Sequence, residues 1–290
     1  MSETGISYVD AVWNPIVGCS HISPACDNCW AEVMAKRMSG MGVPGYSNVV
    51  DKDGHWTGPA LMSEDRIHQL SHWQKPRRVF VCSMADLFHE RIPYWWQELV
   101  LDEMGMVRQH TYLLLTKRPA VMRDRLAEYC RNRNLDAVPS NWWLGVTAEN
   151  QAMADERIPL LLQAPAAVRW VSVEPCLESI DLRHLHYQGG ITEIDALAGT
   201  HGLLRPHGGE CERLDWVVVG AESGPGRRPF DVAWAADLNH QCQEAGVACF
   251  LKQASGLRPG VPLLIDGQVI HEWPEAQQNA TLAGEGRDAE

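Results

Sequence analysis

The feature of this sequence that most constrains its fold is a regular alternation between short apolar runs and longer mixed segments. Seven runs rich in aliphatic and aromatic residues lie at 7–14, 77–84, 111–117, 142–148, 168–174, 214–222 and 247–253. Helical patterns lie between some of them, at 94–109, 119–132 and 233–246. Continuous apolar strands that alternate with helices are typical of a parallel sheet covered by helices.

The length and composition of the chain fit this pattern. A chain of 290 residues, 45% of them apolar, has the size of a single α/β barrel and ample material for a core. We therefore predict an α/β fold, a parallel (βα)6–7 partial TIM-like barrel, in one domain over 1–275. Two insertions, at about 39–73 and 183–213, interrupt the alternation, and long loops of this kind are often lids or binding segments. We expect the polar tail at 276–290 to be disordered.

The expected compartment and partners follow from the first residues and the net charge. The start of the chain lacks the basic and apolar regions of a signal peptide, and no apolar run reaches the length of about eighteen residues that a membrane span needs. We expect a cytoplasmic protein with reduced thiols and no membrane partner. The net charge of −12 differs from the basic footprint of duplex-binding proteins. Basic stretches at 75–78, 116–119 and 131–134 leave nucleic acid open as a partner.

Polar side chains recur at or just after the C-terminal ends of these runs. They are Ser83 and Asp86, then Lys117, then Thr147 and Glu149, then Ser172 and Glu174, then Glu222, and finally Lys252. In a parallel barrel these ends converge on the face that carries the active site. A single Thr or Glu at such a place could merely cap the next helix, but the recurrence predicts a shared cleft.

Three cysteines lie directly after the first run. Cys19, Cys26 and Cys29 have the spacing C-x6-C-x2-C, and three thiolates around a four-iron cluster leave one iron open to a ligand. With His21 as a fourth ligand, the same residues could instead form a closed zinc site. The remaining cysteines are expected to be small core residues: Cys82, Cys130, Cys176, Cys211, Cys242 and Cys249. A second metal site in the later insertion, from His184, His186, His201, His207 and Cys211, is less expected than solvated histidines.

These motifs resemble a known family. An open-iron cluster after the first strand of a βα barrel is typical of radical S-adenosylmethionine (SAM) enzymes, although their commonest pattern has three residues between the first two cysteines. The chain is similar to a phage-associated, largely uncharacterised branch of that superfamily. The similarity continues in "SMADLFHE" (83–90), "LLTKRP" (114–119), "LGVTAENQ" (144–151), "RWVSVEPCLESIDL" (169–182), "WVVVGAESGPGRRPF" (216–230) and "FLKQ" (250–253).

The resemblance implies a set of cofactors and roles. Cys19, Cys26 and Cys29 would bind a [4Fe-4S] cluster that takes an electron from a donor such as flavodoxin or ferredoxin and cleaves SAM to a 5′-deoxyadenosyl radical. Trp30 would pack beside the cluster or the adenine. Asp86 or Glu149 would bind the ribose, Lys117 the carboxylate, and Ser83, Thr147 and Ser172 would be neutral donors. Glu174, Glu222 and Lys252 would act on the substrate as catalytic residues.

The substrate implied by the branch is a nucleobase, free or within phage DNA in the bacterial host cytoplasm. Rearrangement of an amino-acid-modified thymine is one example. For DNA, the cations beside the cleft would be Arg118, Arg227, Arg228 and Lys252, with Trp56 or Trp73 stacking on bases. A radical SAM enzyme acting on a small metabolite or peptide is the alternative. A zinc-stabilised binding protein without catalytic activity is a third possibility.

Overall fold

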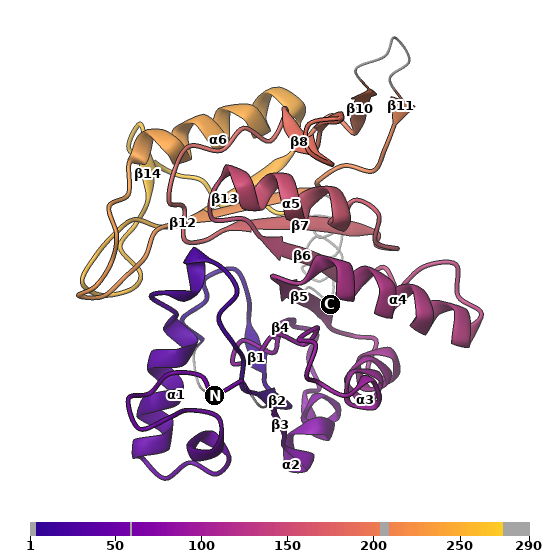
Figure 1. The fold of residues 1–290 in the computed structure, drawn as a ribbon, viewed down its shortest axis with the longest axis vertical. Helices are drawn as coiled ribbons and strands as arrows, with labels where there is room; N and C mark the ends of the chain where they lie inside the picture. The colour runs from indigo at the N-terminus through magenta and orange to yellow at the C-terminus, as the bar shows by residue number, and fades with distance from the viewer. Residues whose placement is uncertain (1–3, 59, 204–208, 275–290) are drawn as a thin grey trace, which may run out of the picture. The chain divides into compact units, whose positions relative to one another are not determined.

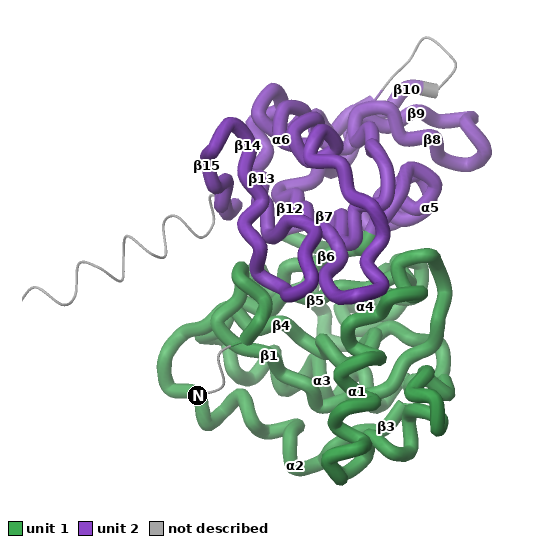
Figure 2. The backbone as a smooth tube through the Cα atoms, turned by 90° about the vertical axis from the view of Figure 1, so that its left-hand side faces the viewer, with its two compact units in different colours: residues 1–147, 163–167 green, residues 148–162, 168–290 purple. Residues whose placement is uncertain are grey.

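The computed structural model describes residues 4–58, 60–203 and 209–274 (Figure 1). The chain divides into two compact units, Met1–Thr147 with Gln163–Ala167 and Ala148–Leu162 with Val168–Glu290 (Figure 2). Each unit is described by itself below. One barrel domain over 1–275 stays a prediction, and the tail at 276–290 lies outside the described residues.

The first unit contains four parallel strands, in the order β1 (Ala11–Trp13), β4 (Arg78–Val81), β5 (Thr111–Thr116) and β6 (Trp142–Thr147). Their register pairs Val12 with Phe80 in one ladder and Leu114 with Leu144 in another. All six residues of β6 are buried. Burial of consecutive residues means that both faces of this strand are covered, which explains its unbroken apolar run.

The three long helices of the first unit are α1 (Trp30–Gly40), α3 (Tyr94–Met106) and α4 (Pro119–Arg133). α4 begins at Pro119. The backbone N–H of a first helical residue has no partner within the helix, so a proline, which lacks that N–H, costs nothing there. α4 ends before Asn134, whose φ of 52° is left-handed, a common helix stop. The predicted helices at 94–109 and 119–132 are confirmed, with ends that differ by a few residues.

The first insertion is part of the core of this unit. It carries η2 (Tyr46–Asn48), β3 (Leu61–Met62), α2 (Glu64–Ile67) and η3 (His68–His72), and β3 pairs antiparallel with β2 (Ile16–Val17). Tyr46 and Val49 pack in one buried cluster with Ala35 of α1 and with Met84, which follows β4. The insertion therefore stabilises the loops around the end of β4.

The second unit contains three parallel strands, in the order β7 (Val168–Val173), β12 (Trp216–Gly220) and β13 (Ala248–Gln253). Its helices are α5 (Gln151–Leu161) and α6 (Val232–Ala245). The Asp231 side chain caps α6 by accepting a hydrogen bond from Ala233 N, and Gly246 ends it with a φ of 65°. Both ends of the predicted helix at 233–246 are confirmed to within one residue.

The second insertion, expected as a loop, contains a small antiparallel sheet. Its strands are β8 (Leu185–Tyr187), β9 (Thr192–Asp195), β10 (Thr200–Leu203) and β11 (Gly209–Glu210), in the order β11-β10-β9-β8. Figure 1 shows this sheet beside α5, and the His186 N–H donates to Asp155 Oδ1 of α5 at 3.1 Å. A hairpin of β14 (Leu264–Ile265) and β15 (Gln268–Val269) follows β13.

The seven apolar runs thus all contain a strand, and the α/β class with parallel pairing is confirmed within each unit. No helix among the described residues combines the length and apolar character that a bilayer crossing requires.

Candidate functional site

The three clustered cysteines line one pocket of the first unit, with a volume of about 140 Å³. Cys19 follows β2, Cys26 ends η1 (Pro24–Cys26), and Cys29 is the residue before α1. Pro24 is the first residue of η1, so a short 3-10 turn lies between Cys19 and Cys29 in the chain. None of the cysteines in the described part of the chain forms a disulfide.

Four of the predicted cofactor-binding residues line the same pocket. Ser83 and Asp86 follow β4, Lys117 follows β5, and Thr147 is the last residue of β6. Because these strands are parallel, their carboxyl ends meet at one edge. The structure therefore brings together the strand-end residues and the cysteine loop of the first unit.

The pocket lining carries three sulfur side chains, from Cys19, Cys26 and Cys29, and thiolates are the ligands of iron–sulfur clusters. The described residues contain no set of three His, Cys, Asp or Glu side chains arranged for a single metal ion. His21, the fourth ligand of the zinc alternative, also lines the pocket, and its Nε2 lies 3.1 Å from Glu32 Oε1. The donor atoms of this lining therefore suit a sulfur-ligated group.

The Asp86 carboxylate organises the pocket wall. It accepts four hydrogen bonds, from Thr116 Oγ1 at 2.7 Å, Phe88 N and Lys117 N at 3.1 Å, and Arg118 Nη1 at 3.0 Å. A carboxylate has about four acceptor positions, so these bonds occupy them. In this conformation Asp86 orients the end of β5 and has no position left for a ribose hydroxyl.

Arg118, suggested from the sequence as a cation for DNA, is part of this site. Its side chain is 3% exposed, and Nε also donates to Glu90 Oε2 at 2.8 Å. Burial with two carboxylate partners makes Arg118 part of the pocket wall and removes it from the cations available to DNA.

The Cys19 thiol is held in its protonated form. Burial, together with the Asp86 charge, raises its pKa to about 11, while Arg118 and Lys117 act in the opposite direction. A thiol with this pKa is neutral at pH 7, and metal ligation requires the thiolate. Metal binding here would therefore release a proton.

Cys82 has two roles where one was expected. It is buried, as predicted for a core cysteine, but it also lines the pocket. Its φ of 58° is left-handed, a strained conformation for a residue with a Cβ atom. Burial raises the pKa of its thiol to about 12. Periodicity gave no sign of this turn at the end of β4.

Glu32 and Trp30 lie on α1 close to the cysteines in sequence. Trp30 is 52% exposed and is not among the pocket-lining residues. Glu32 is buried and accepts hydrogen bonds from Trp56 N at 2.6 Å and His21 Nε2 at 3.1 Å. Its carboxylate thereby connects the cysteine loop and the first insertion to α1, a role that sequence spacing did not indicate.

The other predicted site residues lie in the second unit. Lys252 Nζ is 2.7 Å from Glu174 Oε1, and Glu222 pairs with the Arg228 side chain and accepts from its backbone N–H at 2.7 Å. Ser172 is buried, and its carbonyl accepts a hydrogen bond from Ala148 N.

Glu149 is fully buried and pairs with Arg157 Nη1 of α5 at 3.0 Å. This contact attaches α5 to the segment that follows β6. The predicted substrate acids and Lys252 are thus ion-paired, and Glu149 has a structural partner.

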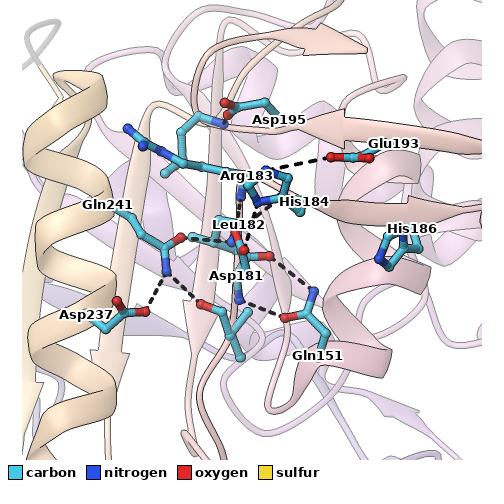
Figure 3. Close-up of polar contacts among 12 residues, drawn as sticks. Gln151, Asp181, Leu182, Arg183, His184, His186, Glu193, Asp195, Asp237 and Gln241 are labelled. Carbon is cyan, nitrogen blue, oxygen red and sulfur yellow. Dashed lines mark hydrogen bonds and ion pairs between the residues drawn. The ribbon is translucent and has the colours of Figure 1, made fainter. Parts of the chain in front are cut away.

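One histidine of the second insertion, His184, lies beside two carboxylates. His184 Nδ1 is 2.8 Å from Asp181 Oδ2, and its Nε2 is 3.7 Å from Glu193 Oε1, as Figure 3 shows. The hydrogen bond to Asp181 raises the pKa of His184, so its cationic form is favoured, which cannot bind a metal. His207, another member of the candidate set for a second metal site, lies outside the described ranges.

A comparison with protein families gives one match. A family model described as "Protein of unknown function (DUF5131)" matches residues 3–286. The chain belongs to this family. Curated proteins and solved structures gave no match.

Proposed function

We propose that this DUF5131 family member is a radical SAM enzyme whose [4Fe-4S] cluster is held by Cys19, Cys26 and Cys29. One observation carries the proposal: the three cysteines of the C-x6-C-x2-C motif line one pocket together with the strand-end residues Ser83, Asp86, Lys117 and Thr147. When bound, such a cluster supplies the electron that cleaves SAM into methionine and a 5′-deoxyadenosyl radical, with flavodoxin or ferredoxin as a donor class.

The side chains of the pocket would orient and shield the bound groups. The Lys117 ammonium lies close enough to Cys19 to lower the pKa of that thiol, so it could neutralise a carboxylate bound at the same place. The Asp86 carboxylate accepts a hydrogen bond from the Lys117 backbone N–H at 3.1 Å, which orients the chain directly after β5. Thr147 is buried in the wall and would help to exclude water, one of the tasks of the protein in this chemistry.

The proposal extends to the rest of the chain as a partial (βα)6–7 barrel in the cytoplasm. In it, Glu149 and Ser172 belong to the SAM side, Trp30 to the edge of the cluster, and Glu174, Glu222 and Lys252 to the substrate side. Glu174 and Lys252 form an ion pair at 2.7 Å, so substrate binding would have to replace that pair or use it intact.

The substrate in this proposal is a nucleobase, free or in DNA, and the alternative is a small metabolite or peptide. Three of the four cations suggested for DNA are engaged with carboxylates: Arg118 with Asp86, Arg228 with Glu222, and Lys252 with Glu174. A cation already paired with a carboxylate neutralises few DNA phosphates, so its binding releases few of the counterions held by the DNA. This observation favours a small substrate over a DNA strand.

Iron content of anaerobically purified protein tests the cluster. We expect about four irons per chain with the broad visible absorption of thiolate-bound clusters, and 5′-deoxyadenosine from SAM after reduction. Replacement of Cys19, Cys26 or Cys29 by Ala should abolish the iron content because each removes a ligand.

Two matched variants sharpen this test. Cys130→Ala changes a buried cysteine of α4 and should keep all the iron. Cys82→Ala changes a cysteine of the same pocket and should also keep the iron. In the proposal Cys19, Cys26 and Cys29 are the only protein ligands, and Cys82 does not bind the fourth iron. Stoichiometric zinc without iron would refute the proposal in favour of a zinc-stabilised binding protein, and loss of iron in Cys82→Ala would refute the open position.

A further inference from the structure

The Ser20 hydroxyl, next to Cys19 in the chain, lies in a hydrogen-bond network that reaches the pocket. Ser20 lines the pocket, and its Oγ is 2.7 Å from His89 Nε2. Arg118 Nη2 donates to the same oxygen at 3.1 Å. Both partners are nearly fully buried, with His89 and the Arg118 side chain each 3% exposed.

The direction of the His89 hydrogen bond follows from its other ring nitrogen. The Arg91 backbone N–H donates to His89 Nδ1 at 3.0 Å, so Nδ1 is an acceptor. Glu90 Oε2, the other group near Nδ1, is 3.6 Å away, beyond hydrogen-bond range. A neutral imidazole has one donor and one acceptor, and therefore Nε2 carries the hydrogen and donates to Ser20. Burial and the Arg118 charge lower the pKa of His89, which agrees with the neutral form.

Counting donors and acceptors then determines the role of Ser20. A serine oxygen has two lone pairs and one hydrogen. His89 and Arg118 supply hydrogens to both lone pairs, so the Ser20 hydrogen cannot be given to either of them. It is available to an acceptor in the pocket that Ser20 lines.

We propose that Ser20, oriented by His89 and Arg118, donates its hydroxyl hydrogen to a sulfur of the group held by Cys19, Cys26 and Cys29. This inference rests on the proposed function, because it needs a sulfur-ligated cluster in the pocket. Hydrogen bonds to cluster sulfurs stabilise the more negative, reduced form and so raise the reduction potential. Ser20 thus makes the cluster easier to reduce.

A redox titration of anaerobic protein tests this role. Ser20→Ala removes the hydroxyl and should shift the reduction potential to a more negative value while the iron content stays unchanged. Ser20→Thr keeps the hydroxyl and should leave the potential close to that of the wild type. His89→Gln keeps a side-chain N–H that can donate to Ser20, so its potential should also stay close.

The results separate the two proposals. Wild-type protein that holds no iron refutes the proposed function. Wild-type and Ser20→Ala proteins with equal iron and equal potentials refute only the role of Ser20. The ring ¹⁵N chemical shifts of His89, measured by NMR in iron-free protein, test the network independently. They should show a protonated Nε2 and an unprotonated Nδ1, and the opposite tautomer overturns the inference.

Discussion

Arg118, His184 and Asp181 are residues whose chemistry depends on their neighbours. The Arg118 guanidinium donates to Asp86, Glu90 and Ser20, a three-directional pattern that a lysine ammonium could not reproduce with the same planar geometry. Read from the sequence, it was one cation of a basic stretch. Its contacts make it a central part of the pocket wall.

His184 gives a prediction for pH dependence at the same scale. The hydrogen bond from its ring to Asp181 raises the pKa of His184, so the pair stabilises the fold fully below the unfolded pKa of about 6.5. That contribution is lost as the pH rises through the higher folded pKa. An NMR titration should therefore place the His184 midpoint above about 6.5.

The control variants for His184 differ in one contact. Asp181→Asn removes the charge and should lower the midpoint. Asp237→Asn changes a nearby carboxylate that accepts from Gln241 and should leave the midpoint unchanged. A midpoint that is the same in wild type and Asp181→Asn would contradict the assignment.

At the scale of elements, α1 holds the cysteine loop and the first insertion through one carboxylate. Glu32 lies in the first turn of α1 and is buried. It accepts from Trp56 N at 2.6 Å and His21 Nε2 at 3.1 Å, and His55 Nδ1 is 3.3 Å from it. These contacts connect segments that lie 11 to 24 residues from Glu32 in the chain.

Glu32→Ala should therefore loosen both segments together. Hydrogen bonds to charged groups contribute about 1.5–3 kcal/mol each, so we expect a loss of unfolding free energy of about that size. Faster hydrogen exchange at the Trp56 amide should accompany it. Glu128→Ala, which removes a half-buried partner of Arg125, should cost less than about 1 kcal/mol. Unchanged exchange at Trp56 in Glu32→Ala would argue against this connection.

At the scale of the whole molecule, net charge and ion pairing act in the same direction. The chain carries a net charge of −12, and Arg118, Arg228 and Lys252 are each paired with a carboxylate. Electrostatic attraction to phosphates is the main source of sequence-independent DNA binding. Little of that attraction is available to this protein.

We therefore expect no retardation of single-stranded DNA in a gel-shift titration, even at low salt. A short basic DNA-binding protein in the same gel provides the positive control. Retardation that weakens steeply as salt is raised would contradict the expectation, because that slope reports released counterions. It would return DNA to first place among the substrates.

Part of the candidate site could be predicted because it depends on local order. The apolar runs located the ends of β4, β5 and β6 and placed the cysteines directly after the first run, so Ser83, Lys117 and Cys19 were expected on one face, and they line one pocket. The Ser20–His89 contact joins residues 69 positions apart, and no spacing rule relates them. The four-stranded insertion was missed because strands of two to four residues with polar sequences give no clear period.

The sequence by itself determined the α/β class, because continuous apolar runs bury both faces of parallel strands, as β6 and β12 do. Tertiary structure decided which polar groups are available for chemistry. Glu149 is occupied by Arg157 and Asp86 by four donors, because a buried charge is stable only when it is paired and hydrogen-bonded. Each buried carboxylate needs such partners wherever it lies in the sequence. Which residues serve as partners depends on how the turns, strands and helices pack.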